Sequence, residues 1–313
     1  MDMPRHVLLQ TKTTNQSFAM HPSLSIYDES VKHFINTDFE IETLSNDCQF
    51  TEGPVWNSEG FYLCSDITAN AVLKFVPGKK KEVFIAQSGT ANEADEDLKP
   101  GQAGSNALAY DGEGSLLVCR HGSHEIARWN GKELQPFLSS YNGKPFNSPN
   151  DLIVDKKGKI FFSDPPYGLK EGKLNPEKFQ PIAGAYCHYN GETKIFCDKY
   201  QYPNGVCLTP DESQLYLCSN KPFEKFISVF DAETLHFKRI LAEENSDGIK
   251  CDPNGNVYLC NKDGIIILNS EGKRLALIQF PTIPANCCWG GEGKKDLFVC
   301  ARENVFQIRN LLR

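Results

Sequence analysis

The sequence lacks the features that mark membrane-spanning, secreted and nucleic-acid-binding proteins. No stretch offers the ~18 consecutive apolar residues that a membrane-spanning helix needs. The N-terminus has neither the apolar run nor the small-residue cleavage site of a secretory signal. Lysine and arginine gather nowhere beyond Lys79-Lys80-Lys81, and the net charge is -7, so a phosphate backbone would be repelled. We therefore expect a cytoplasmic protein that binds neither membranes nor nucleic acid, and the oligomeric state stays open.

Conventional metal motifs and a disulfide framework are missing too. No EF-hand loop, CxxC or HExxH motif occurs in the chain. The 12 cysteines lie in a chain of 313 residues, whereas disulfide frameworks belong to short secreted chains with a small core. Hydrophobic residues make up 40% and charged residues 23%, which is ordinary globular usage, so the chain can bury a sizeable core without cross-links.

Helical periodicity over ten or more residues is absent, and a short strand pattern recurs instead. An apolar strand followed by a small or polar residue appears six times, as FYLCSD (61–66), LLVCRH (116–121), IFFSDP (160–165), LYLCSN (215–220), VYLCNK (257–262) and LFVCAR (297–302). Each copy follows a short strand and a turn rich in Gly, Asp and Asn, which is typical of a hairpin. Repeats of ~40–50 residues with about four strands are the signature of propeller blades.

These repeats predict an all-β fold, a six-bladed β-propeller with a central metal site. The propeller is expected to span residues 38–313 as a single domain, with residues 1–37 as an N-terminal extension. The segment 39–46 is expected to supply the strand that closes the ring against the last blade. Five cysteines share one phase of the repeat, and a free cysteine behaves as a small buried hydrophobe, so we expect structural thiols rather than disulfides or metal ligands.

The residue that opens the inner strand carries a side-chain oxygen in every repeat. These six residues are Glu52, Asn106, Asn150, Asn204, Asp247 and Asn286. Asn and Asp are depleted within strands, although they are common as capping or Asx-turn residues at strand starts. Inner strands of a propeller surround a central channel, so equivalent residues converge on its axis. Six oxygen-bearing side chains in register favour a central site over six separate caps.

The composition of this ring selects the type of ion. Two carboxylates with amide oxygens, and no imidazole or thiolate at the same phase, form a hard oxygen set that suits calcium or magnesium better than zinc. We predict one divalent cation, calcium, with Mg²⁺ and Zn²⁺ as alternatives. The predicted metal ligands are Glu52, Asn150, Asn204 and Asp247.

Several motifs together carry a family resemblance. EGPVW (52–56), SPNDLIVDKKGKIFFSDPPYGL (148–169), YPNGV (202–206) and SDGIKCD (246–252) resemble the family of gluconolactonases, senescence marker protein and luciferin-regenerating enzymes, most closely its bacterial-type gluconolactonases. The resemblance covers roughly residues 48 to 305. It implies a six-bladed propeller with one central metal, held by the four ligands named above, and a substrate-contacting amide at Asn106. It also implies hydrolysis of a small-molecule lactone.

The expected mechanism is metal-assisted hydrolysis. A metal would polarise the lactone carbonyl as a Lewis acid and lower the pKa of the attacking water. Because calcium lowers that pKa less than zinc does, a carboxylate is needed as a base, and Asp247 is the predicted catalytic residue, acting as both ligand and proton acceptor. His121 and Tyr167 are candidate substrate contacts at the mouth of the channel, although a lone histidine is more often a hydrogen-bonded structural residue.

Other acidic residues are expected to serve the fold. Asp151 should point away from its neighbour Asn150 by strand alternation, and Asp66 and Asp164 should anchor turns. The acidic stretch 88–105 is either a lid over the channel mouth or a surface insertion. Two alternative functions remain open: hydrolysis of organophosphates or aryl esters at the same site, and a non-catalytic propeller that serves as an interaction scaffold.

Overall fold

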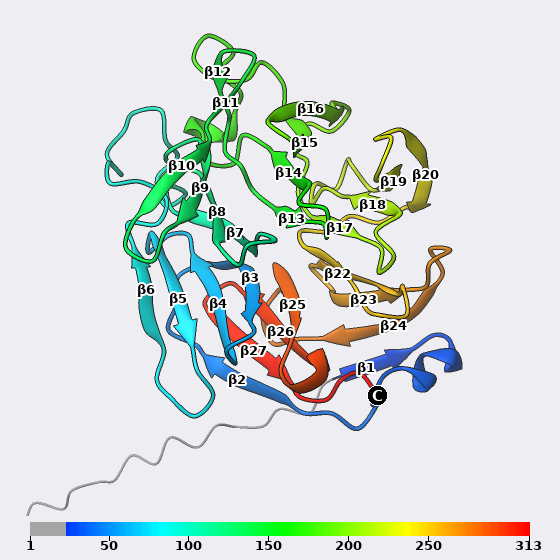
Figure 1. The fold of residues 1–313 in the computed structure, drawn as a ribbon. Helices are drawn as coiled ribbons and strands as arrows, with labels where there is room; N and C mark the ends of the chain where they lie inside the picture. Colours follow the sequence, from blue (N-terminus) through cyan, green and yellow to red (C-terminus); the bar gives the residue numbers. More distant parts are fainter. Residues whose placement is uncertain (1–22) are drawn as a thin grey trace, which may run out of the picture.

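Six antiparallel β-sheets surround one axis in a computed structural model that describes residues 23–313 (Figure 1). This arrangement confirms the predicted all-β, six-bladed propeller. Strands that follow one another in sequence are neighbours in each sheet, because tight turns join them as hairpins. Each residue of the predicted oxygen ring lies at or just before the start of the first strand of its blade, which is the innermost one (Figure 1).

The first three blades lie between residues 51 and 197. Blade 1 contains β3 (Thr51–Asn57), β4 (Phe61–Asp66), β5 (Ala71–Phe75) and β6 (Glu82–Ala86). Blade 2 contains β7 (Ser105–Tyr110), β8 (Leu116–Arg120), β9 (Glu125–Trp129) and β10 (Leu134–Leu138). Blade 3 contains β13 (Leu152–Val154), β14 (Ile160–Asp164), β15 (Gly184–Tyr189) and β16 (Glu192–Cys197).

The last three blades repeat the pattern, and the sixth takes its outer strand from the N-terminal side. Blade 4 contains β17 (Val206–Leu208), β18 (Gln214–Leu217), β19 (Ile227–Asp231) and β20 (Phe237–Ala242). Blade 5 contains β21 (Ile249–Cys251), β22 (Val257–Asn261), β23 (Gly264–Leu268) and β24 (Arg274–Gln279). Blade 6 contains β25 (Asn286–Gly290), β26 (Asp296–Ala301), β27 (Asn304–Ile308) and β2 (Ile41–Ser45).

Strand β2 closes the ring as the sequence predicts. It pairs antiparallel with β27, with Ile41 opposite Ile308 and Thr43 opposite Phe306. Figure 1 shows β2, in blue, along the outer edge of the last blade, drawn in red. The first and last segments of the propeller are therefore held in one sheet.

A few elements lie outside the four-stranded pattern. Strand β1 (Ser23–Ile26) pairs with β24 and adds a fifth strand to blade 5, although it falls within the segment expected to be an extension. A two-stranded ribbon, β11 (Ser140–Tyr141) and β12 (Lys144–Pro145), lies between blades 2 and 3 in sequence. Short 3-10 turns occur as η1 (Glu29–His33), η2 (Lys170–Gly172) and η3 (Glu292–Lys294).

The core consists of six apolar clusters, and each joins two adjacent blades. For example, Phe161 and Ala185 of blade 3 pack with Leu215 and Phe230 of blade 4. The cluster between blades 6 and 1 joins Phe298 and Cys300 to Tyr62, Cys64 and Leu73, and the other four interfaces are built in the same way. Since every blade is packed on both sides, the ring is continuous and each inner strand has a defined position at the axis.

The cysteines are structural, as expected. All twelve are free, eleven are buried and Cys251 is partly exposed. The repeated thiols are fully buried, on the second strand of their blades for Cys64, Cys119, Cys260 and Cys300 and directly after it for Cys218. Burial raises the pKa of most of these thiols, which therefore behave as small apolar groups. Between residues 23 and 313 no helix is long and apolar enough to cross a membrane.

Candidate active site

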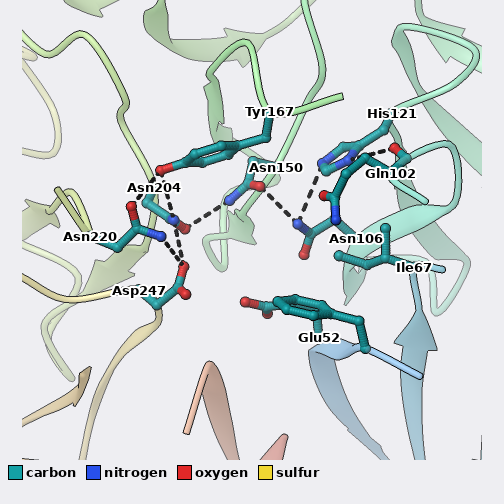
Figure 2. A pocket seen from close by; sticks show the side chains of 11 residues that line it. Glu52, Ile67, Gln102, Asn106, His121, Asn150, Tyr167, Asn204, Asn220 and Asp247 are labelled. Carbon is teal, nitrogen blue, oxygen red and sulfur yellow. Dashed lines mark hydrogen bonds between the residues drawn. The ribbon is translucent and has the colours of Figure 1, made fainter. Parts of the chain in front are cut away.

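A cavity of about 80 Å³ opens at the axis of the propeller. Its lining includes all seven residues that the sequence nominated for the site, drawn from five blades and the loops between them (Figure 2). The full lining is Phe50, Glu52, Ile67, Gln102, Asn106, His121, Asn150, Tyr167, Asn204, Asn220 and Asp247. The structure thus brings together side chains that are nearly 200 positions apart in the sequence, such as Glu52 and Asp247.

Backbone hydrogen bonds position the ring residues in the same way in successive blades. The amide nitrogen of the ring residue donates to the carbonyl of the repeated Cys or Ser on the next strand. The three bonds are Asn150 N to Ser163 O at 2.9 Å, Asn204 N to Cys218 O at 2.8 Å and Asp247 N to Cys260 O at 2.8 Å. Because the register is shared, the three side chains leave their strands at the same height along the axis.

Glycines next to the ring residues allow neighbouring blades to approach closely. Gly53 follows Glu52 at φ +56°, and a Cβ there would lie 2.1 Å from the carbonyl oxygen of Asn106. Gly248 follows Asp247, and a Cβ there would overlap the side chain of Asn286. The EG and DG pairs in the sequence therefore reflect crowding at the axis rather than turn formation.

The ring amides form a continuous chain of hydrogen bonds. Nδ2 of Asn106 donates to Oδ1 of Asn150 at 2.8 Å. Nδ2 of Asn150 donates to Oδ1 of Asn204 at 2.8 Å, and Nδ2 of Asn204 donates to Oδ1 of Asp247 at 2.5 Å. Figure 2 shows this chain as dashed lines across the pocket. Each amide is fixed by its neighbours, so the four side chains are linked in order along the lining of one cavity.

The two carboxylates of the ring share a cavity whose lining within residues 23–313 contains no lysine or arginine; Glu52 is buried and Asp247 is partly exposed. Burial raises the pKa of Glu52 to about 8, and the negative charge of Asp247 adds to this effect. Burial also raises the pKa of Asp247. Oδ1 of Asp247 accepts hydrogen bonds from Asn204 and Asn220, whereas Oδ2 accepts none among residues 23–313. Two carboxylates destabilised by burial, with a free oxygen, form an environment that favours a cation.

The donor set therefore fits a hard divalent cation. Glu52, Asn150, Asn204 and Asp247 offer carboxylate and amide oxygens, which calcium and magnesium prefer. In the part of the chain that the structure describes, no group of three or more His, Cys, Asp or Glu side chains is arranged to hold a metal. The ring has only two such residues, because amides supply its other oxygens.

His121 lies at one side of the pocket as a neutral imidazole. It is fully buried, and burial lowers its pKa to about 4. Nδ1 lies 3.2 Å from the carbonyl oxygen of Gln102, which can only accept, so we assign the ring proton to Nδ1. The unprotonated Nε2 then faces Nδ2 of Asn106 at 3.4 Å. With its one lone pair this nitrogen accepts a hydrogen bond from Asn106 or, in its place, from a substrate hydroxyl.

Tyr167 lies on the opposite side of the pocket. Its hydroxyl donates to Oδ1 of Asn220 at 2.8 Å and accepts from Nδ2 of Asn204 at 3.4 Å. Figure 2 shows the phenol ring spanning the upper edge of the pocket, with its hydroxyl above Asn204. Tyr167 thereby holds Asn220 and Asn204, the two residues that donate to Asp247.

The sixth ring residue does not line the cavity. Asn286 is buried, and its Oδ1 accepts from the backbone nitrogen of Cys287 at 2.9 Å. It packs against Gly248 on the neighbouring strand. The capping interpretation applies to this residue, whereas the other five line the pocket.

The remaining acidic residues behave as the sequence suggested. Asp66 accepts from the backbone nitrogens of Gln49 and Phe50. Asp164 does the same for Asn147 and Ser148, so both carboxylates anchor turns.

Asp151 is buried away from the pocket. Its Oδ2 accepts from the backbone nitrogen of Val206 at 3.1 Å and lies 3.6 Å from Nζ of Lys250. It therefore contributes negative charge near the axis without contacting the cavity.

Four lining residues were not nominated from the sequence: Phe50, Ile67, Gln102 and Asn220. Asn220 had a detectable signal, because it follows the repeated Cys218 by two positions, just as His121 follows Cys119. Gln102 comes from the acidic stretch 88–105, which packs along the pocket through a bond from Lys99 N to the carbonyl oxygen of Gly168. The sequence offered this stretch as a possible lid over the channel mouth, but no repeat covers it, so nothing singled out Gln102.

Comparison with known proteins identifies the family. The model of the SMP-30/gluconolactonase/LRE-like region matches residues 50–303. A gluconolactonase of Zymomonas mobilis is 30% identical over 323 aligned positions, which cover 96% of this chain and 89% of that protein. The chain belongs to the SMP-30/gluconolactonase/LRE-like family. The resemblance inferred from the motifs is thereby confirmed.

Solved structures agree with this family in fold. A gluconolactonase from Xanthomonas campestris aligns with a TM-score of 0.79 and 24% identity, over 95% of this chain and 96% of that one. Regucalcin from Agrobacterium tumefaciens, described as a calcium-binding protein, aligns with a TM-score of 0.67 and 15% identity, over 86% and 93% of the two chains. At these identities the structural likeness supports the propeller fold of this chain.

Proposed function

We propose that this protein hydrolyses a small sugar lactone with the help of one divalent cation, calcium, at the propeller axis. The observation that carries the proposal is the pair of carboxylates, Glu52 and Asp247, which share one cavity with the amides of Asn150 and Asn204 and whose pKa values burial raises. Family membership and the name of the Zymomonas relative support lactone hydrolysis. The calcium-binding description of regucalcin supports the choice of ion.

The cation would be held by Glu52, Asn150, Asn204 and Asp247. When bound, it supplies Lewis-acid polarisation of the lactone carbonyl and lowers the pKa of a nearby water. In our proposal Asp247 accepts the proton of the attacking water through Oδ2, the oxygen that has no hydrogen bond among residues 23–313. Oxygen of that water bonds to the acyl carbon, the acyl–oxygen bond of the ring breaks, and the departing ring oxygen takes up the proton.

The other lining residues would orient the substrate. Asn204 and Asn220 hold the Asp247 carboxylate from its Oδ1 side, which leaves the second oxygen directed at the pocket. His121 would accept from a sugar hydroxyl through Nε2, because its proton lies on Nδ1. Asn106 and Tyr167 would contact the remaining hydroxyls. Holding the ring in this way converts the attack of water into an oriented reaction.

Removal of the proposed ligands tests the function directly. We expect Asp247→Asn and Asn204→Ala to lower kcat/KM for glucono-δ-lactone at least 100-fold, because the cation and the proton acceptor are disturbed together. Asp263→Asn serves as the matched control, since Asp263 is an exposed residue paired only with Lys262 on the surface of the same blade. A chelator should abolish turnover by the wild-type protein, and added calcium should restore it.

The same assay separates the alternatives. A phosphotriester and an aryl ester are assayed beside the lactone, because a cation that polarises a carbonyl can also polarise a phosphoryl oxygen. Faster turnover of either compound than of the lactone would replace the lactonase proposal with the esterase alternative. Wild-type rates in both ligand variants, or activity that survives chelation, would contradict the metal-dependent mechanism. Complete inactivity towards every substrate would favour the scaffold.

A further inference from the structure

Two cations stand over aromatic rings at the rim of the pocket. Nζ of Lys221 lies 5.1 Å from the ring centroid of Tyr167 and 4.3 Å from that of Tyr202. On another blade, the guanidinium carbon of Arg302 lies 4.8 Å from the ring centroid of Phe50. Tyr167 and Phe50 both line the cavity, so each cation is held at its edge by a residue of the site.

Neither cation has a carboxylate partner in the structured region 23–313. Other surface lysines there, such as Lys157, Lys173 and Lys178, form ion pairs with a carboxylate. By contrast, no carboxylate oxygen of this region lies within 4.0 Å of Lys221 or Arg302. Both side chains are half-buried. The chain as a whole carries a net charge of -7, whereas this rim carries two positive charges without a carboxylate partner among the described residues.

The two residues lie at or next to one phase of the repeat. Arg302 follows Cys300 by two positions, in the phase of His121 and Asn220, which line the pocket. Lys221 comes directly after Asn220. Side chains at this phase leave the end of the second strand of the blade on the face where the cavity opens, so Lys221 and Arg302 flank it from blades 4 and 6.

The backbone does not explain the arginine. Arg302 occupies the two-residue turn between β26 and β27, where Ala301 pairs with Asn304. Its φ is +56°, a conformation that glycine or asparagine adopts at lower cost. A long cationic side chain in this position therefore points to a role for the side chain.

We propose that Lys221 and Arg302 form an anion-binding subsite at the pocket mouth, which selects lactones that carry a carboxylate or phosphate substituent remote from the scissile carbonyl. The inference rests on the proposed lactonase function and specifies its substrate class. The guanidinium can bind such a group with two parallel N–H donors, and the ammonium adds a point charge. The rings of Phe50 and Tyr167 would contact the apolar faces of the sugar between them.

The subsite is tested by the preference for anionic over neutral lactones. The probes are glucono-δ-lactone (neutral), glucaro-1,4-lactone (carboxylate) and 6-phosphoglucono-δ-lactone (phosphate). We expect the wild-type protein to show a kcat/KM at least tenfold higher for one anionic lactone than for the neutral one, and the better anion tells carboxylate from phosphate recognition. Lys221→Met, Arg302→Met and the double variant should lower that ratio at least tenfold. In the wild type, 0.5 M NaCl should also lower the ratio, because it shortens the Debye length to about 4 Å and screens the attraction between the anion and the two cations.

Lys225→Met is the matched control, because Lys225 is an exposed lysine of the same segment without a carboxylate partner in the described residues. It should leave the ratio unchanged. Melting temperatures of all variants check folding, and Lys221→Met remains informative if Arg302→Met destabilises its turn. A wild-type ratio near one, or an equal loss in Lys225→Met, overturns the subsite.

Calorimetric binding of glucarate, compared with the neutral polyol sorbitol, gives a readout that does not need turnover. The wild-type protein could bind glucarate, lose that binding in the Lys221 and Arg302 variants, and hydrolyse no lactone. This outcome would support the subsite and refute the lactonase proposal. Hydrolysis of lactones without charge preference would do the reverse. Absence of both turnover and glucarate binding would refute both.

Discussion

At the scale of single residues, the site is defined by two carboxylates, one buried and one partly exposed, that line the same cavity. Glu52 is 4% exposed and faces the same cavity as Asp247, although the two residues come from blades 1 and 5. An isolated buried carboxylate is costly unless a cation or hydrogen bonds compensate it. Glu52 receives a bond from the nitrogen of Gly53, which offsets only part of that cost. The metal-free protein should therefore respond to the protonation of Glu52.

This response has a defined direction. The pKa of Glu52 is raised from 4.5 to about 8, so the folded protein binds a proton that the unfolded chain releases between these values. The stabilisation is fully present below pH 4.5 and is lost as the pH rises through 8. In chelator-treated protein we expect Glu52→Gln to raise the free energy of unfolding at pH 8 by about 1–3 kcal/mol relative to wild type. Urea denaturation at pH 5 and pH 8 measures this difference.

The exposed Glu243 provides the control for this measurement, because Glu243→Gln should leave the pH dependence as in the wild type. Calcium should reverse the ranking at pH 8, since it stabilises the wild-type carboxylate and has less affinity for the amide. An identical pH dependence of wild type and Glu52→Gln would show that Glu52 is not strained by burial.

How far the sequence predicts the site depends on where each residue lies in the repeat. Glu52, Asn150, Asn204 and Asp247 share one phase of six similar units, so their convergence follows from the architecture alone. Asn286 has the same phase but turns to its own backbone, a local choice that no pattern reveals. Gln102 reaches the pocket from a segment outside the repeat, where only tertiary packing decides its position.

At the scale of elements, the closure of blade 6 by β2 joins the two ends of the propeller. Ile41 pairs with Ile308 and is 2% exposed, within an apolar cluster that includes Phe306 and Leu311. Its burial contributes stability only when the last three strands of the chain are in place. This strand is therefore the element on which ring closure most directly depends.

Truncation of Ile41 tests the closure. We expect Ile41→Ala to lower the free energy of unfolding by about 2–5 kcal/mol, because a buried branched side chain is removed from a packed interface. Glu42→Ala in the same strand removes a surface ion pair with Arg309 and should cost less than about 1 kcal/mol. Denaturation curves of both variants give the comparison, and equal losses would mean that β2 does not close the core.

The limits of sequence analysis differ between β2 and β1. Segment 39–46 alternates apolar and polar residues and precedes the first repeat, so its role as the missing strand could be predicted. Strand β1 has four residues and pairs with β24, about 250 positions later. Such a short, distant pairing carries no local signal, because its partner is selected by the position of blade 5 in the finished ring.

At the scale of the whole molecule, the proposed ligands come from four of the six blades. Glu52 belongs to blade 1, Asn150 to blade 3, Asn204 to blade 4 and Asp247 to blade 5. The six apolar clusters already join each blade to the next around the circumference. A cation at the axis would join the same blades at the centre, so it should bind the closed ring and not the unfolded chain.

Calcium should consequently stabilise the protein as one unit. At a concentration 100 times its dissociation constant, a ligand specific for the folded state adds about 2.7 kcal/mol, which corresponds to a rise in Tm of roughly 5 °C for a chain of this size. We expect this rise in a single calorimetric transition, and its loss in Asn204→Ala, whereas Asp263→Asn should retain it. Magnesium and zinc, titrated in parallel, identify the preferred ion by the size of the shift. A Tm that none of the three ions changes would contradict the axial cation, and the carboxylates of Glu52 and Asp247 would then have to be explained by the scaffold alternative.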